Sequence, residues 1–518
     1  MLFNDKKISR GYQNLKQSSE IDRIMFLKAE LTEVKFNSLI VDPLKDKSKN
    51  KNFEISLRQF LIFHLLNNQF HKSLLTYFAD QESSSLRYPL PRIWQRYLRS
   101  KGIKVNAFVC NLLFSAFVLK HLTHGFLEFW IRLFEILMNL FTYQKSLKNK
   151  YIFFDTLTLN NLPHSLSNSY DVISWFYSKN FFQENINIVH SVKNYKPIKE
   201  SPFKLIYKKN YFPIYNSFSQ FLKFFSHSLL SLVHAIKSIF LGRWWSALFF
   251  REIIKYHVFD FSENQSLARE YYFHNSGWIY RPFWTYAAEK KGCKINFYFY
   301  SYNNMNFASK NHERIINYGI TSMSWPNYYV WDKQHADWLK KYVQHEKNIY
   351  TVGPIWFHDS HVKEPINKIM IAVFDIPPFI NSISNTFGLD MELHHSDAAK
   401  KFLNDICEIA TKNNLQVHIK SKRFNKNTDP SYLKLILELE DNKNVFIIDS
   451  NTAAEKIIAN SAATINYPFT STGIISNTLK TPTIYYDPTD FFHQNAVESV
   501  QCIGSKLELE SWMLQFKN

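Results

Sequence analysis

The feature that most constrains the fold is a regular alternation of apolar runs and helical segments between residues 368 and 486. Apolar runs typical of buried strands occupy residues 368–375, 415–420, 445–449, 463–467 and 482–486, and helical patterns separate them. Strands that alternate with helices form a parallel sheet, which binds ligands beyond the carboxyl ends of its strands. The sequence therefore predicts a doubly wound α/β domain with a site at one edge of its sheet.

Further domains precede this one, because 518 residues exceed what a single core usually serves and roughly two or three domains are expected. Residues 1–147 carry apolar positions at helical spacing and predict a helical N-terminal region. Strand patterns recur at residues 151–155, 172–176, 186–189, 295–300 and 328–331. We therefore expect a Rossmann-like domain at 148–350 with a helical insertion at about 200–255, a C-terminal Rossmann-like domain at 351–505, and a C-terminal helix at 506–518.

The formal net charge of +18 indicates an anionic partner, which could be a nucleic acid, an anionic lipid or an anionic small molecule. The sequence has no zinc-knuckle spacing, RNP-like motif or long arginine tract, so nucleic acid is not the expected partner. Its four cysteines show no pairing pattern, which suits a reducing compartment, and its first residues lack the apolar core of a secretory signal. We expect a cytoplasmic protein.

No segment is expected to span a membrane. Residues 105–119 are free of charge, but Lys120, Glu128 and Arg132 follow too closely for a stretch of about 20 apolar residues. Residues 221–240 repeat large apolar side chains at helical spacing, with lysines off that face, and such a helix could lie on the inner membrane as a peripheral contact. We favour the alternative that this stripe packs on the protein core, as in any packed helix.

Three groups of polar side chains fall at predicted carboxyl ends of strands in the last domain. Asp375 ends the first strand, and Lys420, Lys422 and Arg423 end the second. After the fourth strand, Pro468 and Phe469 lead into Thr470, Ser471 and Thr472, where hydroxyls and free helix amides would favour an anion. The alternative is a capped helix without a ligand. Together the three groups predict a site for a phosphate-bearing ligand such as a nucleotide, because lysine and arginine bind phosphate.

Several common catalytic motifs are absent. The sequence contains neither GxGxxG nor GxxxxGK[ST], which argues against a dinucleotide-dependent dehydrogenase and a P-loop NTPase. It also lacks HExxH, CxxC and GxSxG patterns, so a zinc site and an α/β-hydrolase elbow have no support. No cofactor and no metal site are predicted.

Candidates for proton transfer are less clearly marked. His418 lies inside a predicted strand, where a histidine is usually structural, although it could contact a phosphate or protonate a leaving group. A base for an acceptor hydroxyl should come from the first Rossmann-like domain, where Asp155 and Glu263 are our candidates. Residues 274–284 of that domain are dense in polar and aromatic groups that suit sugar binding.

Residues 466–473 resemble the signature of the surface-polysaccharide biosynthesis PFTS-motif family. Supporting segments, in order, are residues 281–284, 330–332, 352–356, 373–377 and 420–423, so the resemblance covers roughly residues 270–490. It implies a GT-B-type glycosyltransferase with two facing Rossmann-like domains, the second of which holds a nucleotide-sugar donor. A wider similarity to bacterial sialyltransferase-like and Kdo-transferase-like enzymes implies a CMP-activated ulosonic acid as donor.

In that wider group a histidine–proline motif and a paired hydroxyl motif contact the CMP phosphate. Thr470, Ser471 and Thr472 fit the hydroxyl motif, but His418 is followed by isoleucine, which shifts the phosphate contact toward Lys420 and Lys422. The resemblance implies inverting, metal-independent transfer to a glycan or lipid-linked glycan. Alternatives are a UDP-sugar or polyol-phosphate transferase of the same architecture, or a non-catalytic scaffold for polysaccharide assembly at the membrane surface.

Overall fold

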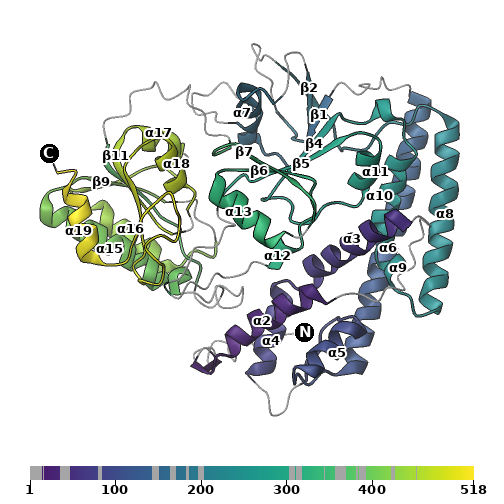
Figure 1. The fold of residues 1–518 in the computed structure, drawn as a ribbon, viewed down its shortest axis with the longest axis horizontal. Helices are drawn as coiled ribbons and strands as arrows, with labels where there is room; N and C mark the ends of the chain where they lie inside the picture. Colours follow the sequence, from purple (N-terminus) through teal and green to yellow (C-terminus); the bar gives the residue numbers. More distant parts are fainter. Residues whose placement is uncertain are drawn as a thin grey trace.

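The structure is a computed structural model in which two parallel sheets follow a helical N-terminal region (Figure 1). It describes residues 14–15, 17–34, 47–79, 85–142, 151–163, 171–181, 186–195, 203–302, 310, 318–343, 345–355, 369–380, 383, 392–421, 426–450, 452–468 and 470–517.

The helical region contains α2 (Glu20–Glu33), α3 (Lys47–Leu65), α4 (Asn68–Phe78), α5 (Arg92–Ser100) and the long α6 (Ala107–Thr142). Buried leucine and aromatic side chains such as Leu27, Leu57 and Trp94 hold these helices together. Gln59 of α3 donates hydrogen bonds to the Ser322 carbonyl and to the Ser324 hydroxyl, at 2.5 and 2.7 Å. The helical region is therefore joined to the first sheet domain by buried polar contacts as well as by packing.

The first sheet has seven parallel strands in the order β3-β2-β1-β4-β5-β6-β7. They are β1 (Tyr151–Phe154), β2 (Asn187–His190), β3 (Lys204–Tyr207), β4 (Glu270–His274), β5 (Lys294–Tyr298), β6 (Asn327–Val330) and β7 (Asn348–Thr351). Its helices are α7 (Val172–Ser178), α8 (Phe218–Phe240), α9 (Trp245–Leu248), α10 (Phe250–Asp260), α11 (Trp284–Lys290), α12 (Tyr318–Thr321) and α13 (Lys333–Tyr342), with 3-10 turns η1 (Leu159–Asn161) and η2 (Asn264–Ser266). The strand order reverses between β1 and β4, which makes a topological switch point there.

Two elements of this domain differ from the sequence expectation. The apolar run at 172–176 is the helix α7 and not a strand, because Asp171 accepts a hydrogen bond from the Ser174 amide at 2.6 Å and caps the helix. The predicted helical insertion at about 200–255 begins with β3, which extends the sheet beside β2. The rest of that insertion is helical, in α8, α9 and the first part of α10.

The second sheet has six parallel strands in the order β10-β9-β8-β11-β12-β13. They are β8 (Ile369–Phe374), β9 (Val417–Lys420), β10 (Val445–Ile447), β11 (Ser461–Asn466), β12 (Thr483–Tyr486) and β13 (Cys502–Ile503). The turn η4 (Glu392–His394) and the helices α15 (Ser396–Asn413), α16 (Pro430–Glu440), α17 (Ala454–Ala459), α18 (Thr472–Thr478) and α19 (Lys506–Leu514) surround it. The predicted α/β architecture of two parallel-sheet domains with a helical N-terminal region is confirmed.

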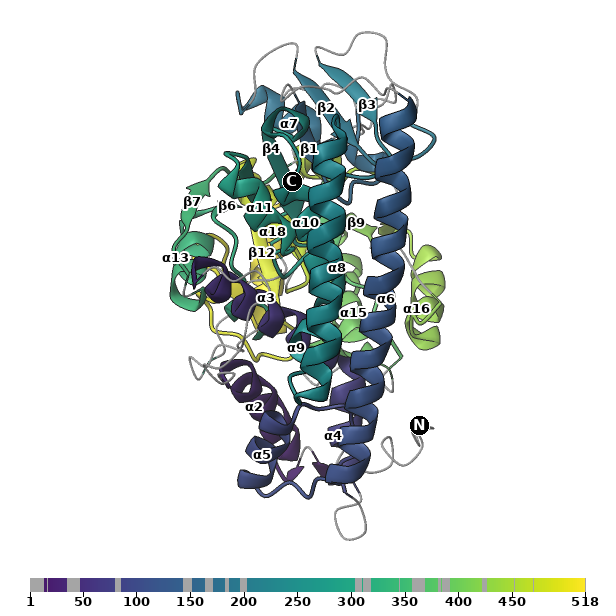
Figure 2. The same cartoon turned by 90° about the vertical axis from the view of Figure 1, so that its right-hand side faces the viewer.

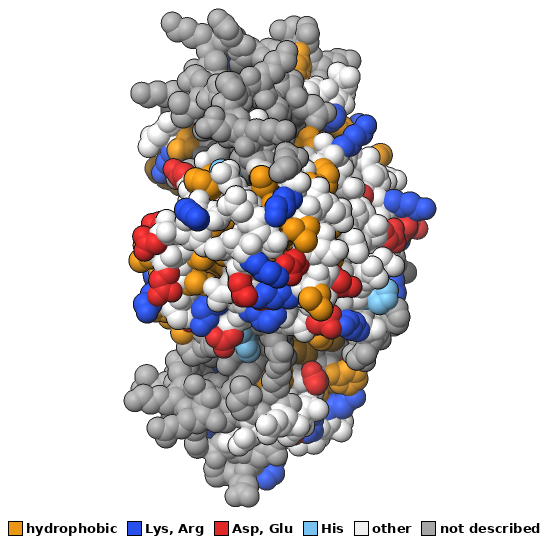
Figure 3. Space-filling view, turned by 90° about the vertical axis from the view of Figure 1, so that its left-hand side faces the viewer, with side chains coloured by type: hydrophobic (Ala, Val, Ile, Leu, Met, Phe, Trp, Pro, Cys, Tyr) orange, Lys and Arg blue, Asp and Glu red, His pale blue; other side chains and the backbone are white. Residues whose placement is uncertain are grey.

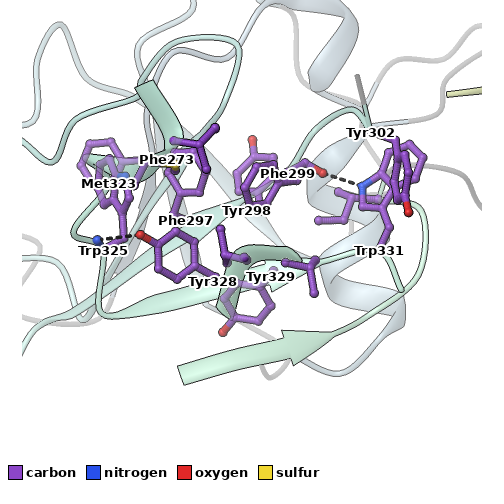
Figure 4. Packing of buried hydrophobic residues seen from close by; sticks show 14 of the residues in the cluster. Phe273, Phe297, Tyr298, Phe299, Tyr302, Met323, Trp325, Tyr328, Tyr329 and Trp331 are labelled. Carbon is purple, nitrogen blue, oxygen red and sulfur yellow. Dashed lines mark hydrogen bonds between the residues drawn. The ribbon is translucent and has the colours of Figure 1, made fainter. Parts of the chain in front are cut away.

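Large aromatic side chains fill the core of the first sheet domain (Figure 4). The Trp325 ring lies 4.9 Å from the rings of both Phe273 and Phe297, and its backbone amide donates to the Tyr328 hydroxyl at 3.0 Å. Toward the strand ends, the Trp331 indole donates to the Phe299 carbonyl at 2.6 Å. This packing fixes the carboxyl ends of β5 and β6.

Helix α6 is long and apolar enough to cross a membrane by length and composition, over Ala107–Phe141. Only 22% of its most apolar stretch is buried in the protein. The expectation that no segment would qualify was therefore wrong by this criterion, because isolated charges such as Lys120 leave the mean hydropathy of the helix at 1.3.

Candidate functional site

A cavity of about 440 Å³ lies between the two sheet domains, at the carboxyl ends of both sets of strands. The first domain contributes Ser276, Tyr300, Ser301 and Trp331, and the second contributes Phe374, Asp375, Ile376, Lys420, Ala454, Thr470, Ser471, Thr472 and Ile475. A cleft at this position is where open parallel sheets bind their ligands. The structure thus brings Asp375, Lys420 and the 470–472 segment to one cavity, as the sequence predicted.

Asp375 follows the last residue of β8 and is the acidic residue among those that line the cavity. The Tyr432 hydroxyl donates a hydrogen bond to its Oδ2, and the Ser421 hydroxyl lies 3.2 Å from that of Tyr432. Its Oδ1 is buried and has no hydrogen-bond partner within the described part of the chain. Burial raises the pKa of Asp375 to about 6, although the hydrogen bonds from Tyr432 and Ser421 oppose that rise. Near neutral pH this carboxyl can accept or release a proton.

Lys420 is the last residue of β9, and β9 pairs with β8 so that Lys420 lies opposite Phe374. Its ammonium group donates to the Ser450 carbonyl at 3.2 Å, and its positive charge acts to lower the pKa of Asp375. The side chain therefore places one cation in the cavity wall beside a buried carboxyl. The neighbouring candidates Lys422 and Arg423 lie outside the described residues.

The segment after β11 is held by its own hydroxyls in a way that the sequence did not predict. Ser471 occupies the N-cap position of α18, but its side chain makes no capping hydrogen bond. Instead the Ser471 hydroxyl accepts from the Tyr302 amide at 3.0 Å, and the Thr470 hydroxyl donates to the Tyr467 carbonyl at 2.7 Å. The expected side-chain cap is therefore absent, and Ser471 joins the two domains at the cavity. Pro468 is buried, and Phe469 lies outside the described residues.

Thr472, the first residue of α18, lines the cavity with a polar atom that has no partner. Its Oγ1 is buried and makes no hydrogen bond to any described residue. A buried hydroxyl without a partner is costly, so such atoms are normally satisfied by water or by a ligand. Together with Asp375 Oδ1 it marks the second-domain wall as one that is ready to bind a polar group.

Gly473, in the first turn of α18, is required because the Tyr485 side chain packs closely against it. A Cβ atom at this position would lie 2.5 Å from the Tyr485 ring. The Tyr485 hydroxyl donates to the Thr470 carbonyl at 2.7 Å, so the ring both packs on the helix and fixes the preceding loop. The glycine of the motif thus serves packing, and the hydroxyl residues before it serve the cavity.

The first-domain wall is built from the loops that follow β4, β5 and β6. The Asn275 side chain accepts from the Tyr300 amide at 2.8 Å and donates to the Ser301 carbonyl at 3.3 Å, which joins the two loops. The Tyr302 hydroxyl donates to Asp332 at 3.1 Å. The hydroxyls of the lining residues Tyr300 and Ser301 are also occupied within their own domain, since they accept from Asn161 and Asn275 at 3.3 Å each.

Sequence reasoning did not name Ser276, Tyr300, Ser301 or Trp331 as individual site residues. Each follows a strand of the first sheet at its carboxyl end, so the rule that selected Asp375 and Lys420 would also have selected them. The signal was present in the strand pattern but was masked by the abundance of aromatic residues in the chain.

The three proton-transfer candidates do not line the cavity. Asp155 lies directly after β1 and is buried, where its Oδ2 accepts from the Trp278 indole at 2.6 Å, and burial raises its pKa. Glu263 precedes β4 at the opposite, amino-end edge of the sheet and accepts from Asn216 at 3.4 Å. His418 lies within β9, stacks on Phe446 with ring centroids 4.7 Å apart, and has a pKa that burial lowers. Their catalytic roles stay predictions.

Among the described residues, no group of three or more His, Cys, Asp or Glu side chains is arranged to hold a metal ion. The cavity wall instead offers a lysine, a carboxyl and hydroxyl groups. Its chemistry is suited to an anionic, hydrogen-bonding ligand.

A family model described as polysaccharide biosynthesis PFTS motif protein matches residues 232–513. The match covers more than half of the chain and includes β4–β13, the cavity walls and residues 466–473. No curated protein matches the chain.

Solved structures match more weakly. An α,α-trehalose-phosphate synthase (UDP-forming) from Burkholderia vietnamiensis is 6% identical, with a TM-score of 0.39 over 72% of this chain and 91% of that one. The UDP-GlcNAc 2-epimerase of Methanocaldococcus jannaschii is 13% identical, with a TM-score of 0.36 over 71% of this chain and 92% of that one. UGT2 of Phytolacca americana is 11% identical, with a TM-score of 0.30 over 70% of this chain and 83% of that one. Similarities this low assign no substrate and no residue role to this chain.

Proposed function

The chain belongs to the polysaccharide biosynthesis PFTS motif family, and we propose that it is a glycosyltransferase whose nucleotide-sugar donor binds in the interdomain cavity. The observation that carries the proposal is the second-domain wall, where Asp375 Oδ1 and Thr472 Oγ1 are buried without partners among the described residues, close to Lys420 in the same cavity. An anionic donor would satisfy Lys420 and Thr472, and the hydroxyl of an acceptor would satisfy Asp375.

The donor is a CMP-activated ulosonic acid, such as a sialic-acid-like sugar or Kdo. Its nucleotide carries a single phosphate, which suits a described wall with one cation, Lys420, flanked by the hydroxyls of Thr470 and Thr472. Lys422 and Arg423 follow Lys420 in sequence and are further candidates for the phosphate. The alternative donor is a UDP-sugar, which carries two phosphates. A turnover assay with both classes of donor distinguishes the two.

Transfer proceeds by direct attack of an acceptor hydroxyl on the anomeric carbon. As the new carbon–oxygen bond forms, the bond from that carbon to the phosphate oxygen breaks, and its electron pair leaves with CMP. The configuration at the anomeric carbon inverts, and the acceptor proton passes to a base. Lys420 and the neighbouring hydroxyls stabilise the charge that develops on the departing phosphate. We expect activity to survive treatment with EDTA, because these side chains supply the stabilisation.

Asp375 is the base in this scheme. It lines the cavity, its Oδ1 has no partner within the described chain, and its pKa of about 6 is near the operating pH. Asp155 is less suited, because Trp278 occupies its Oδ2 and it does not line the cavity. The acceptor, a glycan or lipid-linked glycan, would approach along the first-domain wall of Ser276, Tyr300 and Ser301.

The test is a donor-turnover assay with the purified full chain. We expect CMP release from CMP-Kdo or CMP-N-acetylneuraminic acid, with loss of that release in Lys420→Ala. Turnover of UDP-sugars alone would overturn the CMP assignment but keep the glycosyltransferase. Release of neither nucleotide by folded protein, with polymer production unchanged in cells carrying Lys420→Ala, would favour the scaffold alternative.

A further inference from the structure

The outer side of the α6–α8 pair carries many exposed apolar residues that the proposed function does not use. The two helices lie side by side and antiparallel on the face turned toward the viewer in Figure 2. Phe129 of α6 contacts Phe224 and Phe225 of α8, with ring centroids 6.2 and 6.1 Å apart, and Phe114 of α6 contacts Trp244 just beyond the end of α8. The pair therefore forms one continuous surface.

Helix α8 exposes more large apolar side chains than it buries. Its buried side includes the small residues Ser228, Ser231, Ala235 and Ser238. Its exposed side carries large apolar residues, which include Leu222, Leu229, Leu230, Val233, Ile236 and Phe240, with Leu230 66% and Phe240 85% exposed. The expectation that the stripe packs on the core holds for Phe221, Phe225 and Leu232, which pack partly buried against it. It fails for Leu229, Ile236 and Phe240, which are exposed, because small residues such as Ser231 and Ser238 take the buried positions beside them.

Helix α6 continues the apolar surface. Its exposed side includes Leu112, Leu119, Phe126, Trp130, Phe134 and Phe141, and Phe134 is 65% exposed. Its acidic residues point the other way: Glu128 pairs with Arg132 at 2.8 Å and with Arg251 of α10 at 3.2 Å, and Glu135 also pairs with Arg132. Gly125 lets α10 approach on this inner side, where a Cβ would lie 2.8 Å from the Arg251 amide. We call the exposed residues of both helices the outer face.

The charges around the outer face have one sign. Helix α8 contains no Asp or Glu, and its exposed Lys223 and Lys237 flank the apolar stripe. Exposed Lys120 lies on α6, and exposed Arg243 follows α8. The described part of the opposite side differs, because Figure 3 shows Lys and Arg interspersed there with Asp and Glu and with scattered apolar side chains. An apolar surface bordered by cations complements a bilayer with anionic headgroups.

We propose that the outer face docks onto an anionic lipid bilayer, with α6 and α8 lying in the plane of its interface. At about 1.5 Å per residue, the 36 residues of α6 extend about 54 Å, far longer than a hydrocarbon core of about 30 Å. The ion pairs of Glu128, Arg132 and Arg251 fasten the middle of α6 to α10, which keeps it on the protein. Monomeric soluble proteins rarely expose apolar patches beyond a few hundred Å².

The test is flotation of the full chain with vesicles of phosphatidylglycerol and phosphatidylethanolamine, compared with phosphatidylcholine alone. We expect the wild type to float with the anionic vesicles. Leu230→Gln/Val233→Gln should weaken binding about a hundredfold, because two apolar side chains no longer enter the interface. Lys223→Gln/Lys237→Gln should weaken it about fivefold per lysine, on anionic vesicles only. The matched control is Leu437→Gln/Leu507→Gln, which removes exposed leucines of the C-terminal domain and should bind as the wild type does.

A wild type that stays unbound, or a Leu230→Gln/Val233→Gln variant that floats as well as wild type, overturns the proposal. A dimer that this variant dissociates, without any vesicle binding, also overturns it and makes the face a contact between two copies. Dyes that report depth in the bilayer distinguish an α6 that lies in the interface from an α6 that spans the membrane. Because the four native cysteines are buried, a dye attached to Leu112→Cys, Phe126→Cys or Phe141→Cys labels that one position of α6 and reports its depth in the bilayer. Similar shallow depths support the proposal, and a deep Phe126 position between shallow ends overturns it.

Discussion

The two halves of the molecule use amphipathic helices in opposite ways. In the C-terminal domain, α15 buries Phe402, Leu403 and Ile406 against its sheet. In the N-terminal half, α8 buries Phe224 and three serines but exposes most of its large apolar side chains, among them Leu230 and Phe240. Both sequences are amphipathic with a helical period, so periodicity locates the apolar side but does not say what covers it. The difference indicates that α15 faces a protein core and α8 faces a second, apolar environment.

The two walls of the cavity differ in a related way. On the first-domain wall, the hydroxyls of Tyr300 and Ser301 accept hydrogen bonds from Asn161 and Asn275 of the same domain. On the second-domain wall, Asp375 Oδ1 and Thr472 Oγ1 lack partners within the described ranges. Buried polar atoms that the protein leaves without partners are sites for a ligand or water. We therefore expect the second-domain wall to bind most of the donor.

The largest expected effect is the loss of turnover when Asp375, on the second-domain wall, is replaced. Asp375→Asn should lower kcat for donor turnover by roughly 10²–10⁴-fold, because the base of the second-domain wall is removed. In the wild type, the rate should rise as pH increases through about 6, where Asp375 loses its proton. Steady-state assays of both proteins from acid to neutral pH check this. A variant with wild-type turnover would contradict the assignment.

Stability measurements on the same variant show whether its loss of activity is chemical. The folded-state pKa of about 6 lies above the ordinary 3.8, so the contribution of this carboxyl to stability is fully present below pH 3.8. It falls by roughly 3 kcal/mol as pH rises through 6. Asp375→Asn should therefore unfold at no lower denaturant concentration than wild type at neutral pH. A marked loss of stability would indicate a structural role.

A pair of truncations tests the contrast between α15 and α8. Phe402→Ala should lower the free energy of unfolding by about 3–5 kcal/mol, because the side chain is fully buried and leaves a cavity. Leu230→Ala should change it by less than about 0.5 kcal/mol, because that side chain is 66% exposed. Urea denaturation in the absence of lipid measures both. Equal losses would show that the outer face packs on protein.

Lys420→Ala tests whether Lys420 binds the phosphate of CMP. Loss of a charged hydrogen bond should weaken CMP binding by about 1.5–3 kcal/mol, roughly ten- to a hundredfold. Lys434→Ala is the control, because Lys434 lies on the exposed side of α16 in the same domain, paired with Glu438 at 3.3 Å. Calorimetric titration of both with CMP provides the comparison. Equal affinities would place the phosphate elsewhere.

Thr472→Val has the smallest expected effect. It keeps the shape of the side chain and removes a buried hydroxyl that has no partner among the described residues. The free energy of unfolding should stay the same or rise by up to about 1 kcal/mol, while CMP binding weakens by about 1 kcal/mol. Thermal unfolding with and without CMP reports both values. A destabilised variant would mean that the hydroxyl already has a protein partner.

The sequence predicted the second sheet well, because strands buried on both faces of a parallel sheet appear as continuous apolar runs. Residues 172–176 form a similar run but fold as α7, where the capping carboxylate of Asp171 decides the outcome. Asp375, Lys420 and residues 470–472 could be predicted because carboxyl ends of parallel strands share an edge. The Ser471 contact with Tyr302 and the outward orientation of α8 could not, since both depend on how separate elements pack.

The most direct test of the central claim is a crystal structure of the full chain with CMP bound. The account predicts CMP in the cavity between the sheets, with its phosphate within hydrogen-bond distance of Lys420 Nζ and of the hydroxyl of Thr472. Nucleotide bound outside this cavity, or an empty cavity in crystals soaked with CMP at saturating concentration, would contradict it.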